Sequence, residues 1–325
     1  MNGMEETLQS AYVLGIERVK AWSDLLDDIN VFPIADGDTG RNLISSLAPL
    51  LQMEGDREET IRRLLMAARG NSGNIANRFF TGLLTADSLE RLPQAARIGR
   101  DNAWEAVHDP VPGTMLTVFD ALVEFLEERD IENREESVQE IIKLLEKAVR
   151  STQELLPTLK QAGVVDSGAL GMYVFLEGFF KSLINQTDDF LPITTRFQGV
   201  LTVSPQFQEE TAGGYCVDTV VQLKQGSTAA TEFGEKMGES TVVIPHQDYL
   251  KVHLHTSNRE ELKEQLSAMG DIVEWSDDDI GAQIADFKKS SPKQMVHIMT
   301  DAAGSVTLQD AQDHGITLLD SYINA

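Results

Sequence analysis

Two carboxylates stand two residues apart at Asp36 and Asp38, with Gly37 between them and Thr39 directly after. Carboxylates about 5 Å apart repel each other by roughly 3 kcal/mol at an effective dielectric constant of about 20, so a proton or a cation must relieve the repulsion. Because a predicted helix follows at once, its free N–H groups face the loop, and hard oxygen ligands there suit Mg²⁺ shared with phosphates. The alternative is a solvated turn in which Asp38 caps the helix.

A second set of metal-ligand types is divided between two strand-like segments. Cys216 is the only cysteine and lies in segment 214–223, whereas His253 and His255 alternate with apolar residues in segment 249–256. Side chains two residues apart on a strand share a face, so both histidines point the same way. We expect the two strands to be neighbours, which brings one thiol and two imidazoles together. Such a set with one open position suits Zn²⁺, and an ordinary half-exposed pair of strands is the alternative.

Three further segments combine small residues with the start of a predicted helix. They are residues 68–73, 110–118 and 163–171. Free backbone N–H groups in such turns can approach phosphates closely, although each segment is also an ordinary helix cap when taken alone. The sequence has neither a Walker A motif nor a Gly-x-Gly-x-x-Gly motif, which disfavours P-loop and dinucleotide-binding folds.

The elements that must position these residues change character near residue 190. Residues 1–189 are predicted to be an all-α domain, because apolar residues recur there at helical spacing. Helices are expected at 4–26, 41–52, 57–68, 72–86, 94–107, 114–128, 135–149, 152–162 and 167–186. Loops rich in Gly, Pro, Asp and Asn separate them.

Residues 190–285 are predicted to form an α+β domain. Strands are expected at 214–223, 240–244, 249–256 and 271–275, and helices at 231–237 and 259–269. This βαββαβ order indicates a ferredoxin-like sandwich, in which the first and third strands are central. Residues 286–325 contain a linker, which begins near the acidic run 277–279, and two short strands at 295–299 and 316–319. These are too few to build a core of their own.

The whole segment 30–42 closely resembles the metal-binding loop of the DhaL-type nucleotide domain of dihydroxyacetone kinases, and still more its version in bacterial fatty acid kinases. The resemblance implies that Asp36 and Asp38 are the catalytic residues and bind Mg²⁺. Val31 stands where the dihydroxyacetone branch has a further Asp ligand, so Asn30 is the nearest oxygen donor for a third position.

The three glycine-containing segments match the loops of this family that surround ATP, in the family's order. The resemblance therefore implies an antiparallel helical barrel with the metal and the nucleotide at one end. Residues 74–78 depart from the family's apolar pattern. The nucleotide-binding residues that the match implies are Thr39, Gly40, Asn42, Gly70, Asn71, Ser72, Gly73, Thr114, Asp166, Ser167 and Gly168.

Two later segments extend the resemblance. The surroundings of Cys216, His253 and His255 are similar to the middle domain of fatty acid kinases, where the matching side chains bind a metal, here taken as Zn²⁺. Residues 296–305 resemble the opening strand of DegV-type fatty-acid-binding proteins. The resemblance implies a DegV-like partner domain, either in a longer parent chain or in trans.

Composition limits the partners. The 325 residues include 42% hydrophobic ones and carry a formal net charge of −25, which disfavours nucleic acid and anionic membranes. A single cysteine excludes an intrachain disulfide and fits a reducing compartment. The chain shows no leader segment and no apolar run long enough to span a bilayer. We expect a cytoplasmic protein, and a homodimer is left open.

The leading hypothesis is an ATP-dependent kinase that transfers the γ-phosphoryl group to a fatty acid carboxylate presented by a DegV-like domain. A kinase of dihydroxyacetone or another small hydroxy-ketone is the nearer alternative. A nucleotide-binding regulator without catalytic activity is the alternative from another class, and the departures at 74–78 are what favour it.

Overall fold

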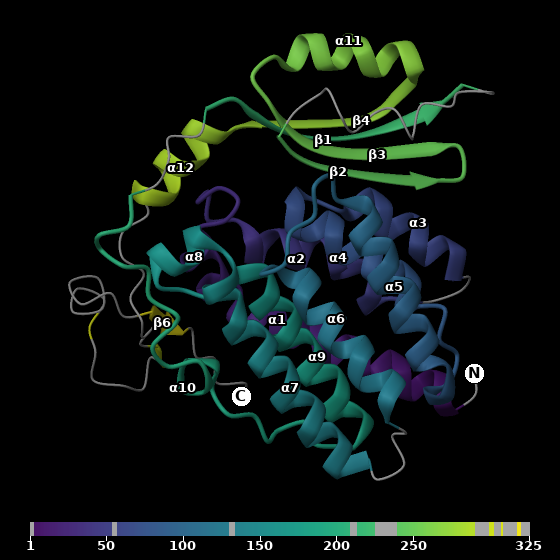
Figure 1. Ribbon diagram of the computed structural model, residues 1–325, viewed down its shortest axis with the longest axis vertical. Coiled ribbons are helices and arrows are strands. Elements are labelled where there is room, and N and C mark those ends of the chain that lie inside the picture. The colour runs from purple at the N-terminus through teal and green to yellow at the C-terminus, as the bar shows by residue number, and fades with distance from the viewer. Residues whose placement is uncertain are drawn as a thin grey trace, which may run out of the picture. The chain divides into compact units, whose positions relative to one another are not determined.

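The computed structural model describes residues 3–53, 57–129, 134–208, 213–224, 239–289, 299–301, 307 and 317–319. The chain divides into two units, Met1–Ile284 and Ala285–Ala325. The first unit holds a helical part followed by a small sheet, as Figure 1 shows. Across the described ranges, no helix is long and apolar enough to cross a membrane.

The helical part confirms the predicted all-α character of the N-terminal region. Its α-helices are α1 (Gly3–Asp28), α2 (Thr39–Leu47), α3 (Arg57–Ala67), α4 (Gly70–Leu83), α5 (Leu92–Ala106), α6 (Met115–Glu128), α7 (Arg134–Leu155), α8 (Pro157–Ala162), α9 (Ser167–Leu183) and α10 (Ile193–Arg196). Two 3₁₀ turns, η1 (Ala48–Leu51) and η2 (Leu89–Arg91), lie between them. A closed barrel of these helices stays a prediction.

One expected helix boundary was wrong. A break was expected near residue 150, but α7 continues to Leu155 and the next helix begins at Pro157. Proline lacks an N–H group and its ring clashes with the preceding turn, so it ends one helix and suits the first position of the next. Thr152 tolerates the helix interior because its hydroxyl donates to the carbonyl of Val149 at 2.6 Å.

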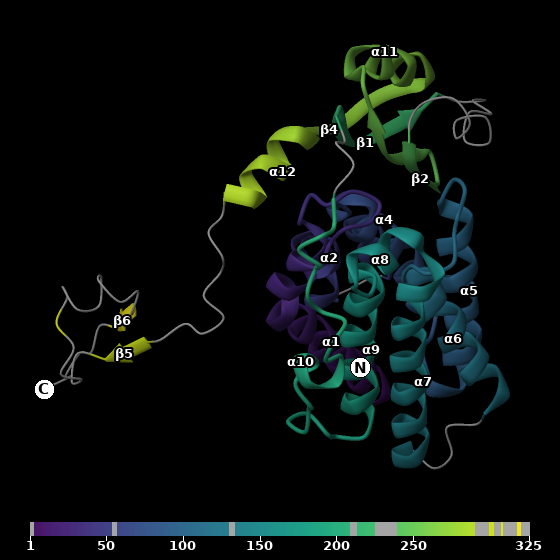
Figure 2. The same cartoon turned by 60° about the vertical axis from the view of Figure 1, so that its left-hand side comes forward.

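The core of the helical part is organised around α9, whose residues are all buried. It packs against α1, α2, α6 and α7, and Figure 2 shows it between α1 and α7. A helix that is apolar on all sides belongs in such a position. Its one buried acid, Glu177, accepts from the guanidinium of Arg18 at 2.8 Å and lies 3.6 Å from that of Arg196. The charge is therefore paired where it is buried.

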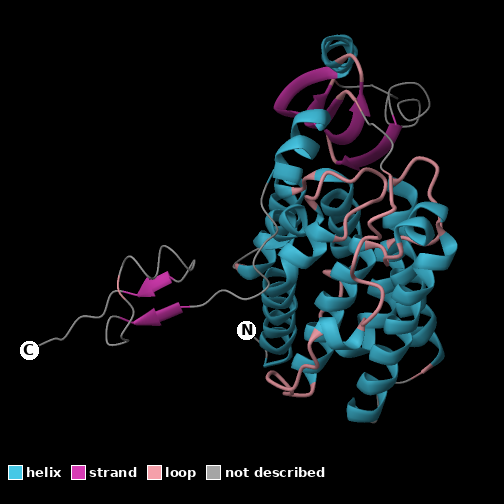
Figure 3. Cartoon of the chain, turned by 90° about the vertical axis from the view of Figure 1, so that its left-hand side faces the viewer, coloured by secondary structure: helices cyan, strands magenta, loops and turns pink. Residues whose placement is uncertain are grey.

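The sheet follows the helices and is drawn in magenta in Figure 3. Its strands are β1 (Tyr215–Leu223), β2 (Glu239–His246), β3 (Tyr249–Thr256) and β4 (Gly270–Asp279), and α11 (Arg259–Met269) connects the last two. The order is β2-β3-β1-β4 with antiparallel neighbours, so the prediction that the first and third strands pair is confirmed. The helix expected at 231–237 lies outside the described residues, and the ferredoxin-like topology stays a prediction.

The acidic run 277–279 is not the start of a linker, as had been expected. It forms the end of β4, paired with the start of β1, and α12 (Ile280–Lys289) follows directly. Asp277 accepts from the guanidinium of Arg259 at 3.1 Å and from the indole of Trp275 at 3.2 Å. These partners hold the carboxylate in a strand that composition alone would not favour.

The two faces of the sheet are buried in different ways. Val217, Val221, Val252 and other apolar residues pack under α11. The alternate residues on the opposite face include polar and charged ones that are also buried, among them Lys251, which is 0% exposed. These polar residues lie on the side of the sheet that contacts α4.

The second unit contains one described element pair. β5 (Met299–Asp301) and β6 (Thr317–Leu319) pair in parallel. Most of the segment 296–305, whose resemblance to DegV-type proteins was noted, lies outside the described residues. That resemblance stays a prediction.

Candidate functional site

The loop between α1 and α2 places Asp36 and Asp38 side by side. Their side chains share a hydrogen bond, and Asp36 is only 9% exposed. Burial and, after it, the charge of Asp38 raise the pKa of Asp36 to about 8. Burial also raises the pKa of Asp38. Two carboxyl groups held in this way require a shared proton or a cation, which is the condition that the sequence predicted.

Asn30 organises this loop from the end of the first helix. Its amide nitrogen donates to Asp36 Oδ1 at 2.8 Å, and its amide oxygen accepts from Thr39 Oγ1 at 2.5 Å and Ser167 Oγ at 3.2 Å. The Ser167 and Thr39 hydroxyls are also 3.0 Å apart. As placed, Asn30 orients Asp36, and its amide would have to rotate to present oxygen to a cation. Its role as a magnesium ligand stays a prediction.

The N-terminus of α2 is partly occupied by a residue that the sequence reasoning set aside. Asp27 is buried in α1 and accepts from Gly40 N at 2.7 Å and from Arg41 Nε at 3.1 Å. A Cβ on Gly40 would lie 2.1 Å from the carbonyl oxygen of Ser23, so this glycine allows α1 and α2 to approach. Gly40 therefore serves the packing that holds the Asp36 loop in place.

The loop before α4 reaches the same region. Gly70 has φ 62°, a conformation that favours glycine, and a Cβ there would lie 2.2 Å from Asn42 Nδ2. Asn42 in turn bonds the side chain of Asp38. Ser72 and the neighbouring Asn71 line the cavity described below, with N–H groups in the first turn of α4.

The other two predicted loops supply helix caps at the rim. Thr114 caps α6 and accepts from Leu116 N at 3.4 Å. Asp166 caps α9, accepts from Ala169 N at 2.7 Å, and its pKa is raised to about 7 by burial. The side chain of Asp166 is thus used by the protein backbone.

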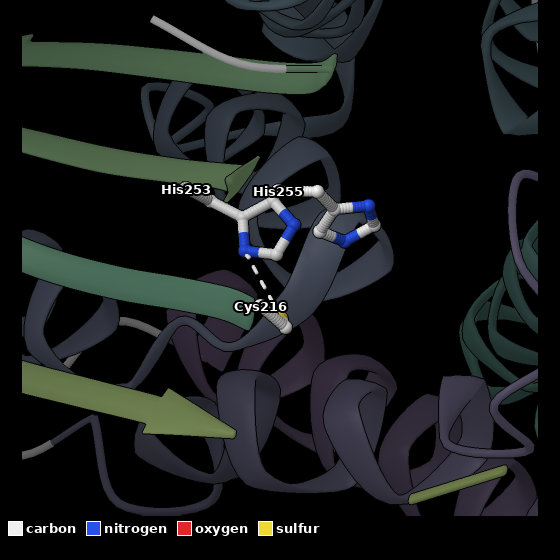
Figure 4. Close-up of side chains that lie close together, drawn as sticks. All are labelled: Cys216, His253 and His255. Atoms are coloured by element: carbon white, nitrogen blue, oxygen red, sulfur yellow. Dashed lines mark hydrogen bonds between the residues drawn. The ribbon is translucent and has the colours of Figure 1, made fainter. Parts of the chain in front are cut away.

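Cys216, His253 and His255 converge from β1 and β3, as Figure 4 shows. Their ligand atoms all lie within 4.8 Å of one another, and Cys216 Sγ is 4.0 Å from His253 Nδ1. A tetrahedral zinc with ligands at about 2.0–2.3 Å keeps those atoms roughly 3.5 Å apart, so a small contraction would close this set on one ion. His253 Nε2 is buried without a hydrogen-bond partner, which fits a nitrogen reserved for a metal.

The electrostatics around these three side chains also fit a cation. Burial, and then the neighbouring carboxylates of Asp218, Asp38 and Asp36, raise the pKa of the Cys216 thiol. Burial lowers the pKa of His255 to about 3, so its imidazole is neutral and free to act as a ligand at neutral pH. The thiol is protonated in this surrounding, and a divalent cation is what would reverse that preference.

One cavity of about 630 Å³ joins the aspartate loop and the Cys216 cluster. Of the predicted site residues, Gly40, Asn42 and Gly73 do not line it. Those that do are Asn30, Asp36, Asp38, Thr39, Gly70, Asn71, Ser72, Thr114, Asp166, Ser167, Gly168, Cys216, His253 and His255.

Sequence reasoning missed the rest of the lining. Apolar residues from three loops and helix starts form one wall, and Ser240 and Thr241 of β2 add hydroxyls. Val107 forms a β-bridge with Val242, and His108 N donates to the carbonyl of Thr241 at 3.0 Å, so β2 holds the loop after α5 at the rim. The apolar wall consists of Phe32, Pro33, Ile34, Ile75, Val107, Val111, Met115 and Leu116.

Asp218 was also missed, although it is the most connected buried acid between the sheet and α4. It accepts from Gly70 N at 2.9 Å and from Asn74 Nδ2 at 2.8 Å. This contact accounts for a polar residue at 74, where an apolar one was expected. Within segment 74–78 only Ile75 lines the cavity, so the departures there do not alter most of its wall. The alternation of β1 places Asp218 on the face of Cys216, but its partners are far away in sequence.

Comparison with known families divides the chain at the same place as the fold. Residues 33–181 match the DAK2 domain, and residues 212–286 match the FakA-like middle domain of fatty acid kinases. The first match contains the aspartate loop and the loops at Gly70, Thr114 and Asp166. The second contains all four strands and the Cys216 cluster.

Whole-chain relatives are known from staphylococci. An uncharacterized protein of Staphylococcus saprophyticus is 30% identical over 295 residues, covering 80% of this chain and 52% of that protein. One of Staphylococcus haemolyticus is 32% identical over 297 residues, covering 80% and 52%. One of Staphylococcus aureus strain USA300 is 32% identical over 276 residues, covering 75% and 50%. The chain thus spans about half the length of these relatives.

Proposed function

Because the chain belongs to the DhaL-type kinases related to the FakA-like fatty acid kinases, we propose that it transfers the γ-phosphoryl group of ATP to a fatty acid carboxylate. A DegV-like domain, in a longer parent chain or in trans, would present that carboxylate. The activity is proposed for the longer protein, since this chain covers about half of its relatives.

The observation that carries the proposal is the pair Asp36 and Asp38 at the end of a cavity of about 630 Å³ that the predicted nucleotide loops line. The described residues that line it include no lysine or arginine, but they include Asp36, Asp38, Asp109 and Asp166. The charge of ATP would therefore have to be balanced by a cation held on the aspartate pair. Mg²⁺, when bound, supplies that balance across the phosphates.

The protein's own groups would bind and orient the nucleotide. The N–H groups of the first turn of α4 and the hydroxyls of Thr39 and Ser167 are donors in the lining, suited to phosphate oxygens. The apolar wall formed by Ile34, Met115 and the side chains around them suits an adenine ring. Positioning and charge neutralisation are the main requirements of phosphoryl transfer, so no covalent step on the protein is needed.

The Cys216 cluster lies in the same cavity, and its donor set favours Zn²⁺. Zinc, when bound, would act as a Lewis acid toward an oxygen of the acceptor. His255 is half-buried and His253 is fully buried, so the cluster presents its more accessible edge to the cavity.

The proposal is tested with the full-length parent, Mg·ATP and a fatty acid bound to a DegV-like protein. Acyl phosphate is trapped with hydroxylamine and measured as the hydroxamate. The wild type should form it and Asp38→Asn should not, while Asp87→Asn, at an exposed side chain far from the cavity lining, should match the wild type. ATP turnover with dihydroxyacetone instead of fatty acid would support the alternative kinase. Nucleotide binding without turnover on either substrate would support the regulator.

A further inference from the structure

Asp218 stands between the two parts of the proposed site, and one of its oxygens serves both. Oδ2 accepts from Gly70 N at 2.9 Å and lies 3.2 Å from His253 Nδ1. Oδ1 accepts from Asn74 Nδ2 at 2.8 Å and lies 3.7 Å from Lys251 Nζ. The carboxylate is 6% exposed, so water does not compete for these contacts. We infer that Asp218 is a positioning residue that couples the Cys216–His253–His255 cluster to the phosphate-binding loop before α4.

The effect on His253 follows from acceptor chemistry. A carboxylate offers no proton, so the imidazole nitrogen that faces it, Nδ1, carries the hydrogen and donates. The other nitrogen, Nε2, then has its lone pair free, and it is the atom left buried without a hydrogen-bond partner. Histidines that bind metals are commonly oriented in this way by a carboxylate on the second nitrogen. Asp218 thus selects the tautomer in which Nε2 can bind the metal.

Charge balance supports the same arrangement. A histidine that binds a metal is neutral, so Asp218 needs another cation to remain ionised in a buried place. Lys251 supplies it, since its ammonium is 0% exposed and Asp218 is its one ion-pair partner among the described residues. The neighbouring pair Arg69 and Glu274 is balanced by itself at 2.5 Å. No charge of the cluster is left for His253 to neutralise.

The effect on the phosphate loop is mechanical. Gly70 is held in a left-handed conformation, and its N–H is fixed by Asp218 rather than by its own helix. Arg69 is held on β4 through Glu274 at the same junction. A cation on the cluster would restrain His253, and through the shared oxygen it would restrain Gly70. Coupling between two sites is reciprocal, so nucleotide and metal should strengthen each other's binding by the same factor.

This inference rests on the proposed function, and its test keeps the two apart. Zinc affinity is measured by competition with a chromophoric chelator, and Mg·ADP affinity by calorimetry, each with and without the other ligand. In the wild type we expect each ligand to tighten the other several-fold. In Asp218→Asn, zinc affinity should fall about 10–100-fold and the mutual tightening should disappear. Asp248→Asn, an exposed acid on the same sheet, is the matched control and should behave as the wild type.

A second variant and a spectroscopic reading protect the test against misfolding. Asn74→Ala leaves the contact between Asp218 and His253 intact, so it should keep zinc affinity while reducing the coupling. In metal-free wild type, ¹⁵N NMR of the His253 imidazole should show the Nδ1–H tautomer, and Asp218→Asn should shift it toward Nε2–H.

Wild-type zinc affinity and tautomer in Asp218→Asn would overturn the inference. So would a wild type that binds Mg·ADP but no zinc, and that result would leave the kinase proposal standing. A wild type that binds zinc but no nucleotide would instead remove the kinase proposal, and the inferred coupling would fall with it.

Discussion

The two halves of the candidate site are built by opposite means. The aspartate loop is contiguous, and Asp36 and Asp38 are held by neighbours such as Asn30 and by the start of α2. The Cys216 cluster is assembled from two strands, in which Cys216 pairs with His255 and Asp218 with His253. A slip of one residue between these strands would turn one set to the opposite face. Local chain geometry therefore determines the first half, and strand register determines the second.

The two halves also differ in how their charges are relieved. The aspartate pair carries raised pKa values, so it needs a proton or a cation from outside. Asp218 beside the cluster has its pKa held below the ordinary range by His253 and Lys251, against the effect of burial. The protein therefore neutralises its own charge at the junction and leaves charge unbalanced only where a cation is proposed.

The contiguous loop should show the largest effect. Asp38→Asn removes one charge of the pair at constant size, and we expect the affinity for Mg·ADP to fall by more than about 100-fold, since loss of a ligand should exceed the effect of an outer partner. Far-ultraviolet circular dichroism should remain that of the wild type. Calorimetry that gives an unchanged affinity would remove the metal role of the loop.

The two-strand cluster should lose its metal as a unit. Purified wild type should contain close to one zinc per chain, and Cys216→Ser combined with His253→Ala should contain none by elemental analysis. The melting temperature should fall, because binding of a structural metal contributes to folding stability. His246→Ala, outside the cluster on β2, is the control. Protein without zinc and with unchanged melting after the double substitution would show an ordinary strand pair.

A buried charge far from the site sharpens the contrast between stability and binding. Glu177→Gln leaves Arg18 and Arg196 without their carboxylate, and we expect urea denaturation to show a loss of about 2–4 kcal/mol. The affinities for zinc and Mg·ADP should not change. Glu154→Gln, in an exposed ion pair with Lys160, should have almost no effect. Equal effects of the two substitutions would contradict the role assigned to Glu177.

The smallest effect is expected at a helix cap on the cavity rim. Thr114→Ala removes the hydroxyl that accepts from Leu116 N, and we expect a loss of about 1 kcal/mol of stability, measured by urea denaturation. Thr114→Ser retains the hydroxyl and should retain most of the stability. If the serine variant lost as much as the alanine variant, packing of the methyl group would explain the effect instead.

Much of this protein was readable from its sequence, because local chemistry is written locally. The helical spacing of apolar residues predicted the all-α region, and the alternation in segment 249–256 predicted that both histidines share a face. The aspartate pair was readable because its two members are two residues apart.

Only the tertiary structure decided which distant groups meet. Asp218 lies 148 positions from Gly70 in sequence, and no periodicity in either segment indicates that they bond. Asp27 appeared to be a helix residue without a task, yet the approach of α1 to α2 makes it the acceptor for Gly40. Long-range pairing depends on how whole elements pack, and that is a property of the complete core rather than of any one segment.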